Sequence, residues 1–279
     1  MNDLLAKTRE ICQMFEIKPS HTKGQNFLIN EKIYDDLVKA AELGPEDTVL
    51  EIGPGLGFLT TKLAERVKRV VAVELDDKLA SYLKTGFAAR DTANVEIVNS
   101  DILRFNPETL AGEKYKIVAN LPYNISSIFL RQFLSANARP ELMVLMLQKE
   151  VAERIAAAPP DMSILAVSVQ YYSDPEIVRE VKAGNFWPEP KVDSVIIKIN
   201  VRAENHSTAE DKLFFRLVRT GFSSKRKMLK NNLAAGLKIK ASEAEEILVA
   251  SGFDPKIRAE DLSLANWQKI FGSFRRFMV

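Results

Sequence analysis

The chain has 279 residues, 46% of them hydrophobic and 27% charged, the composition of a globular protein with enough apolar residues for a full core. No apolar run approaches the roughly 20 residues of a membrane-spanning helix, and residues 1–30 lack the pattern of a signal or transit peptide, so we expect a cytoplasmic protein. The single cysteine, Cys12, excludes an internal disulfide and the usual zinc-site spacing, so we expect no metal site. The two histidines, His21 and His206, stand beside no plausible nucleophile, which disfavours serine- or cysteine-histidine catalysis.

The net charge of +2 is unevenly distributed along the chain. The segment from Lys212 to Lys240 contains nine Lys and Arg residues and no Asp or Glu, so it carries +9 and the remainder of the chain carries −7. This asymmetry favours a polyanionic partner that one region of the protein binds. The alternative is a solvated helix face, but such faces usually mix both signs.

From residue 48 onward, short β-branched apolar runs alternate with segments of helical spacing, which is typical of an α/β fold with a parallel sheet. Strands are expected at 48–53, 69–75, 95–100, 115–121 and 141–147. Helices are expected at 56–67, 77–87 and 128–135. A further helix is expected at 163–172, and two later strands, 176–183 and 194–201, have no helix between them. These two strands predict an antiparallel addition at the sheet edge.

The C-terminal part of the sequence has a different pattern. Residues 202–211 are polar without strong periodicity and are expected to form a linker. The following residues have helical spacing at 212–222, 225–237, 241–253 and 264–277. We therefore expect two domains, with the sheet in residues 1–203 and a small basic helical domain in residues 204–279.

A glycine-rich loop follows the first predicted strand and contains Gly53, Gly55 and Gly57. Glycine lets the backbone turn sharply and approach a ligand closely. Glu74 ends the second strand 21 residues after Gly53, where a carboxylate can hold a ribose diol. The pattern predicts an adenosine-containing cofactor. Because Phe58 replaces the last glycine of the dinucleotide fingerprint, S-adenosylmethionine fits better than a nicotinamide or flavin cofactor, which stay alternatives together with a simple strand–helix turn.

Asp101 follows the third predicted strand, where it can accept a hydrogen bond from a cofactor adenine amine or simply form a turn. The run Asn120-Leu121-Pro122-Tyr123 closes the fourth strand. An adenine amine is a poor nucleophile because its lone pair is delocalised into the ring. Acceptors such as the Asn120 amide oxygen and the Leu121 carbonyl can accept hydrogen bonds from its two protons and make the nitrogen more nucleophilic. Pro122 stiffens the backbone, and stacking on Tyr123 is worth on the order of 1–3 kcal/mol. The run therefore predicts methyl transfer to an adenine amine by positioning and electrostatics, with an ordinary loop as the alternative.

The chain resembles the ribosomal RNA adenine dimethyltransferases, the KsgA family of bacteria, in an ordered series of motifs along nearly its whole length. These motifs are GQNFLIN (24–30), EIGPGLGFLT (51–60), VAVELD (71–76), NSDIL (99–103), NLPYNIS (120–126), LMLQKEVAERI (145–155), FWPEPKVDSVI (186–196), GFSSKRKMLKNNL (221–233) and RAEDLSLANW (258–267). Two departures keep polarity or charge: Asn30 stands where Asp is commoner, and Lys225-Arg226-Lys227 where an Arg pair is commoner.

The resemblance implies a Rossmann-like S-adenosylmethionine methyltransferase sheet, mostly parallel with an antiparallel edge strand, followed by a small all-helical domain. It implies cofactor contacts that spacing alone would not reveal, at Gln25, Asn26 and Leu28. It further implies contacts at Gly53, Glu74, Asp101 and Asn120. Gly55 of the glycine loop is expected to contact the cofactor as well. The implied reaction gives each of two adjacent adenosines near the 3′ end of small-subunit (16S) rRNA two methyl groups, in late ribosome assembly. We expect the protein to act as a monomer.

The basic C-terminal domain is then expected to bind rRNA phosphates through Lys225, Arg226 and Lys227, and Phe186 to face the extruded target base. A large-subunit rRNA adenine methyltransferase of the antibiotic-resistance type is the nearest alternative, and Leu121 with residues 186–194 favours the small-subunit branch. A nucleic-acid-binding factor without catalysis is the second alternative. An NAD-linked oxidoreductase is the third, and no candidate hydride-site acid supports it.

Overall fold

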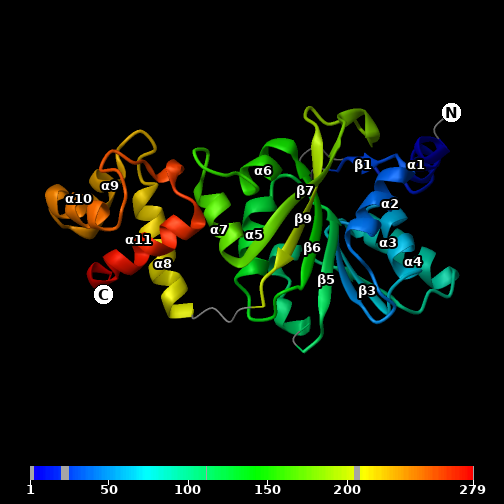
Figure 1. The fold of residues 1–279 in the computed structure, drawn as a ribbon. Coiled ribbons are helices and arrows are strands. Elements are labelled where there is room, and N and C mark those ends of the chain that lie inside the picture. The colour runs from blue at the N-terminus through cyan, green and yellow to red at the C-terminus, as the bar shows by residue number, and fades with distance from the viewer. Residues whose placement is uncertain (1–2, 20–24, 111, 204–207, 279) are drawn as a thin grey trace. The chain divides into compact units, whose positions relative to one another are not determined.

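The computed structural model describes residues 3–19, 25–110, 112–203 and 208–278; His21 and His206 lie outside these ranges. The chain divides into two compact units, one formed by Met1–Ala152 with Ser173–Arg202 and the other by Glu153–Tyr172 with Ala203–Val279 (Figure 1). The units therefore change near residue 203, as the predicted domains do. Residues 153–172 group with the C-terminal helices in the second unit.

The first unit contains a seven-stranded sheet in the order β4-β3-β2-β5-β6-β9-β7 (Figure 1). Its strands are β2 (Thr48–Ile52), β3 (Arg69–Glu74), β4 (Val95–Asn99), β5 (Tyr115–Asn120), β6 (Leu142–Gln148), β7 (Ser173–Val181) and β9 (Ser194–Val201). The neighbouring strands β4, β3, β2, β5 and β6 pair in parallel. Strand β9 pairs antiparallel with both β6 and β7. The predicted parallel sheet with an antiparallel edge is confirmed, and the chain reaches the edge in β7 before it returns in β9.

Helices cover the sheet because their apolar residues recur at helical spacing. Those of the first unit are α1 (Asp3–Met14), α2 (Glu31–Ala40), α3 (Phe58–Ala64), α4 (Asp77–Ala89) and α5 (Ser126–Leu134). Leu37 of α2 and Leu63 of α3 share a buried cluster with Val49, Val70 and Val118 of the sheet. These strands are buried along their lengths, which explains why their sequences are nearly continuously apolar.

A second, two-stranded sheet pairs β1 (Phe27–Leu28) antiparallel with β8 (Phe186–Trp187). Neither strand was expected from the sequence, because two residues are too short to show a period. Helix α6 (Lys149–Ile155) follows β6 directly. The 3₁₀-helices among the described residues are η1 (Ile102–Arg104), η2 (Pro107–Leu110), η3 (Ala183–Asn185), η4 (Ala259–Asp261) and η5 (Arg275–Phe277).

The second unit is helical. It contains α7 (Ile164–Tyr172), α8 (Thr208–Gly221), α9 (Leu229–Leu237), α10 (Ala241–Ala250) and α11 (Leu264–Phe274). Tyr171 stacks on Phe214 with ring centroids 4.6 Å apart, and Trp267 is fully buried. Two boundaries differ from the prediction: α8 already begins inside the expected linker, and α9 begins at Leu229 rather than at residue 225.

Candidate active site

The loop between β2 and α3 contains three glycines with φ in the left-handed region, Gly53, Gly55 and Gly57. Gly55 and Gly57 have φ angles of +58° and +78°, in the left-handed region. A Cβ atom at Gly55 would lie 3.2 Å from the Phe27 ring, and one at Gly57 would lie 2.7 Å from the Leu83 side chain. Glycine is therefore required for the conformation of the loop and for its packing, which brings bare backbone to the ends of the strands.

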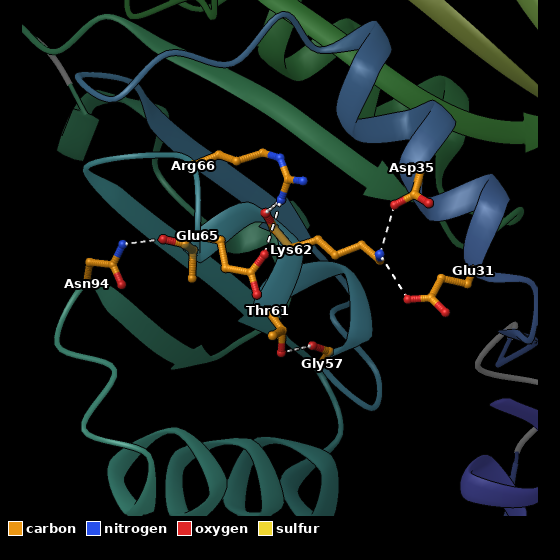
Figure 2. Close-up of polar contacts among 9 residues, drawn as sticks. Glu31, Asp35, Gly57, Thr61, Lys62, Glu65, Arg66 and Asn94 are labelled. Carbon is orange, nitrogen blue, oxygen red and sulfur yellow. Dashed lines mark hydrogen bonds and ion pairs between the residues drawn. The ribbon is translucent and has the colours of Figure 1, made fainter. Parts of the chain in front are cut away.

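Helix α3, which begins directly after this loop, is tied to α2 and to the loop itself (Figure 2). Lys62 Nζ forms ion pairs with Asp35 at 2.8 Å and Glu31 at 3.2 Å, both on α2. The Thr61 hydroxyl donates to the Gly57 carbonyl oxygen at 2.9 Å. These contacts fix the end of the loop relative to the helix layer.

The Glu74 carboxylate is oriented by backbone groups on both sides. Its Oε2 accepts from the Gly55 N–H at 3.1 Å, and its Oε1 accepts from the Asp76 N–H at 2.9 Å. Burial raises the pKa of Glu74, and the two backbone hydrogen bonds oppose that shift. The end of β3 is thus joined to the glycine loop, with a buried carboxylate between them.

The residues predicted to bind a cofactor come together in one cavity. It is lined by all eight of them: Gln25, Asn26, Leu28, Gly53, Gly55, Glu74, Asp101 and Asn120. Because β4, β3, β2 and β5 are parallel neighbours, the residues at their carboxyl ends lie side by side. That a cofactor contacts each of these residues remains a prediction.

Asn120 and Pro122 of the predicted catalytic run also line this cavity. The Asn120 amide nitrogen donates to the Asn26 carbonyl oxygen at 3.3 Å, so the amide oxygen is the group left to accept a hydrogen bond. The segment before β2 and the end of β5, 94 residues apart in the sequence, therefore meet at the same part of the cavity.

Leu121 and Tyr123 are not among the lining residues of the cavity. Leu121 is buried, and its N–H donates to the Met146 carbonyl oxygen at 3.2 Å, which continues the pairing of β5 with β6. The Tyr123 hydroxyl shares a 2.8 Å hydrogen bond with the Ser194 hydroxyl at the start of β9. Burial raises the pKa of Tyr123, so its hydroxyl stays protonated and serves as an anchor.

Phe186 does not have the position that the sequence predicted. Its side chain is only 3% exposed and belongs to the main hydrophobic cluster, and its backbone pairs with Leu28. The expected contact of this ring with a target base is therefore corrected: Phe186 is a core residue. The physical reason is the pairing of β8 with β1, which directs this position inward and leaves the next residue, Trp187, half-buried.

The cavity includes residues that the sequence reasoning missed, notably Glu51 and Tyr34. Glu51 stands inside a buried strand, and a charged residue in an apolar strand is a signal that could have identified it. Apolar lining residues such as Leu75 and Ile102 carry no such signal.

The predicted phosphate-binding residues lie in the second unit, in the turn between α8 and α9. Lys225, Arg226 and Lys227 are all exposed, and none forms an ion pair within the described part of the chain. The turn is held from inside, because the Asn232 amide nitrogen donates to the Gly221 carbonyl at 2.6 Å and to the Ser224 carbonyl at 3.0 Å. Three free cations thus project from a fixed turn.

The chain is similar to known proteins over nearly its whole length. A family model described as ribosomal RNA adenine dimethylase matches residues 16–275. The chain is 43% identical to ribosomal RNA small subunit methyltransferase A of Dehalococcoides mccartyi over 96% of this chain and 92% of that protein. It is 39% identical to the protein of the same name from Alkaliphilus oremlandii, over 94% and 93% of the two chains.

Two solved structures are also similar. A dimethyladenosine transferase from Plasmodium falciparum is 28% identical, with a TM-score of 0.78 over 90% of this chain and 98% of that one. The 23S rRNA methyltransferase ErmE is 29% identical, with a TM-score of 0.74 over 90% and 100%. The matched range contains the glycine loop, the Asn120–Tyr123 run and the basic turn. The chain therefore belongs to the ribosomal RNA adenine dimethylase family of S-adenosylmethionine-dependent methyltransferases.

Proposed function

We propose that the protein transfers methyl groups from S-adenosylmethionine to the exocyclic amines of two adjacent adenosines near the 3′ end of 16S rRNA, giving N(6),N(6)-dimethyladenosines. The observation that carries this proposal is the cavity that joins Glu74 and Asp101 to Asn120 and Pro122. The names of the bacterial relatives support the small subunit as the substrate. The protein would act as a monomer on the pre-ribosomal small subunit, in the cytoplasm, during ribosome biogenesis.

The lining of the cavity suits the cofactor. S-adenosylmethionine has no phosphates, and the glycine loop offers close-approaching backbone rather than a phosphate cradle. Glu74, fixed by two backbone N–H groups, would hold the ribose diol. Asp101 after β4, whose Oδ1 accepts from the Leu103 N–H at 2.9 Å, would accept from the adenine amine. Bound there, the cofactor supplies an already activated methyl group.

The chain then needs to position and polarise the target amine rather than to supply a strong base. The Asn120 amide nitrogen donates to the Asn26 carbonyl, so its oxygen would accept a hydrogen bond from one proton of the amine. The Leu121 carbonyl would accept the other proton. Hydrogen bonds from both protons to these acceptors would make the nitrogen more tetrahedral and more nucleophilic.

Tyr123 would support the flat face of the target base. Its hydroxyl is anchored on Ser194, which limits the orientations of the ring. Base–aromatic stacking contributes roughly 1–3 kcal/mol per base, enough to offset part of the cost of extruding the adenosine.

The exposed turn at Lys225, Arg226 and Lys227 would hold rRNA phosphates without reading the bases. Residues 1–203 would then form the catalytic domain, and residues 204–279 the rRNA-binding domain. Methyl transfer and RNA binding would thus be separable by mutation.

A methyl-transfer assay on isolated subunits tests the proposal. Unmodified small and large subunits are incubated separately with the protein and S-adenosylmethionine labelled in its methyl group. Label is expected in 16S rRNA of the small subunit. The structural similarity to ErmE makes 23S rRNA the specific alternative substrate, and label in 23S rRNA alone would refute the proposal.

A further inference from the structure

A second cavity, of about 830 Å³, adjoins the cofactor cavity in the first unit. It lies between α1 with the residues that follow it, the start of α4, and Trp187 of β8. Asp76 lines both cavities, and Trp187 pairs in the small sheet with Phe27, which lines the cofactor cavity. None of the residues assigned above to the cofactor, to catalysis or to the basic turn lines this second cavity. It is a separate site beside the reaction centre.

Trp187 forms the aromatic part of the wall. Its ring is half-buried and packs against a small apolar cluster of Cys12, Ile17, Phe27, Leu56 and Leu79. The Arg9 guanidinium carbon lies 5.7 Å from the ring centroid, near the outer limit of a cation–π contact. The cluster holds the ring in place, while the arginine above it is exposed and only loosely bound. Trp187 therefore offers a fixed aromatic surface to a flat ligand.

Two cations of this cavity, Arg9 and Lys18, are exposed and form no ion pair within the described part of the chain. The acidic groups of the cavity are already engaged. Glu16 lies 3.9 Å from Lys78 Nζ, which also donates to the Glu16 carbonyl oxygen at 3.3 Å. Asp76 accepts from two backbone N–H groups at the start of α4. The two unpaired cations are thus available to an anionic group of a ligand.

The end of α1 fixes the chain at the edge of this cavity. The Glu16 N–H donates to the Gln13 carbonyl at 3.3 Å, and the Ile17 N–H donates to the Cys12 carbonyl at 2.8 Å, the pattern of a Schellman motif. Glu16 has a φ angle of +50°, in the left-handed region where glycine is usual. A side chain at this position strains the backbone, so the surrounding contacts, rather than local preference, hold the turn that leads into Lys18.

We propose that this cavity, the Arg9–Trp187 pocket, binds an unpaired nucleotide of the rRNA substrate other than the one being methylated; this inference rests on the proposed methylation of rRNA. The base would lie on the Trp187 ring, and a phosphate would pair with Arg9 and Lys18. Unpaired RNA is bound by such combinations of aromatic rings and cations. Stacking of a base on an aromatic ring is stronger than an exposed cation–π contact, so the base displaces the guanidinium, which then pairs with the phosphate.

The proposed reaction gives such a pocket a use beside the reaction centre. Two adjacent adenosines each receive methyl groups, and only one of them is at the methyl donor at a time. The segment that carries them must therefore be unpaired and held while one base reacts. The Arg9–Trp187 pocket would hold this segment by a second base, outside the cofactor cavity.

Tryptophan fluorescence of the full chain tests whether a base binds in the pocket. The chain has two tryptophans, and the other one, Trp267, is fully buried in the second unit. A short single-stranded oligoadenylate is the probe. We expect it to quench the emission of the wild type and not that of Trp187→Leu, which keeps apolar bulk against the cluster. An emission that the probe leaves unchanged in the wild type would overturn the inference.

Steady-state kinetics on small subunits test whether the substrate uses the pocket. Trp187→Leu should raise the KM for small subunits about tenfold or more, as expected for the loss of one stacked base, with the KM for S-adenosylmethionine unchanged. Arg9→Gln with Lys18→Gln should also raise the KM for small subunits and make its salt dependence less steep by about one unit of logarithmic slope. The matched control is Lys39→Gln with Lys84→Gln, which removes two other exposed cations of the first unit and should behave as the wild type.

The inference is overturned if the two charge variants have the same KM and the same salt dependence. It is also overturned if Trp187→Leu raises the KM for S-adenosylmethionine as much as that for small subunits, because Trp187 would then only support the cofactor cavity. If Trp187→Leu does not fold, the charge variants decide, since their substitutions are at exposed positions. A wild type that methylates neither subunit would instead refute the proposed function.

Discussion

The cofactor cavity and the basic turn differ in how their functional groups are held. In the cavity, Glu74 is buried and fixed by two backbone N–H groups, and Asn120 is oriented by Asn26. In the turn, Lys225, Arg226 and Lys227 are exposed, and the fixed element is the backbone beneath them, through Asn232.

This difference follows from the ligands that the two regions would bind. A small cofactor and a reacting amine need acceptors placed to within a fraction of an ångström, which burial and second hydrogen bonds provide. Exposed cations attract a phosphate backbone over several ångströms, so their side chains do not need to be held in one exact position. The cavity should therefore be sensitive to single isosteric changes, whereas the turn should respond to total charge.

The largest effect is expected from Asn120→Ala, which removes the acceptor for the target amine. We expect kcat to fall by about 100- to 1,000-fold, as for the loss of one oriented transition-state partner. Binding to small subunits, measured by sedimentation, should remain as in the wild type because the basic turn is intact. A variant with normal turnover would show that Asn120 does not act on the amine.

Neutralising the turn by Lys225→Gln, Arg226→Gln and Lys227→Gln together should affect binding rather than chemistry. The salt dependence of rRNA affinity should become less steep by about two units of logarithmic slope, since each phosphate contact contributes roughly 0.7–0.9. A matched control changes three exposed lysines of the first unit to Gln, at positions Lys68, Lys84 and Lys114. If both triple variants have the same slope, the turn is not the phosphate-binding site.

A smaller effect is expected from Tyr123→Phe, which keeps the ring and removes its hydrogen bond to Ser194. Loss of one such bond corresponds to about 0.5–1.5 kcal/mol, or a two- to tenfold fall in kcat/KM. Tyr123→Ala, which also removes the stacking face, should lose more. Equal rates for the two variants would mean that the ring does not contact the base.

The smallest effect on activity is expected from Phe186→Leu, because Phe186 lies in the core. The variant should lose about 1–2 kcal/mol of unfolding free energy in urea titrations. Its KM for small subunits should not change at a temperature where the variant is folded. A raised KM with unaltered stability would restore the base-facing role that the sequence suggested for this residue.

The parallel strands, and the grouping of the candidate cofactor residues around one cavity, were predictable because both follow from simple local rules. Buried parallel strands are continuously apolar, and ligands bind at their carboxyl ends, which identified Glu74, Asp101 and Asn120. The family resemblance was needed for Asn26 and Leu28, since they precede the sheet and show no spacing signal.

The remaining features depend on tertiary contacts. Phe186 was placed wrongly because the facing of a two-residue strand is set by its partner, Leu28, and not by a period. Lys225 was expected inside a helix, yet α9 begins only at Leu229, whose N–H donates to the Ile257 carbonyl from a distant segment. Glu51 was overlooked, although a charged residue inside a buried strand was a visible signal in the sequence.

Mass spectrometry of nuclease fragments of 16S rRNA tests the central claim most directly. Small subunits that lack the modification are incubated with S-adenosylmethionine and either the wild-type protein or the Asn120→Ala variant. The wild type should add four methyl groups, two on the exocyclic amine of each of two adjacent adenosines near the 3′ end, and the variant should add almost none. Methyl groups on a ring nitrogen, on ribose or on other nucleotides would contradict the account.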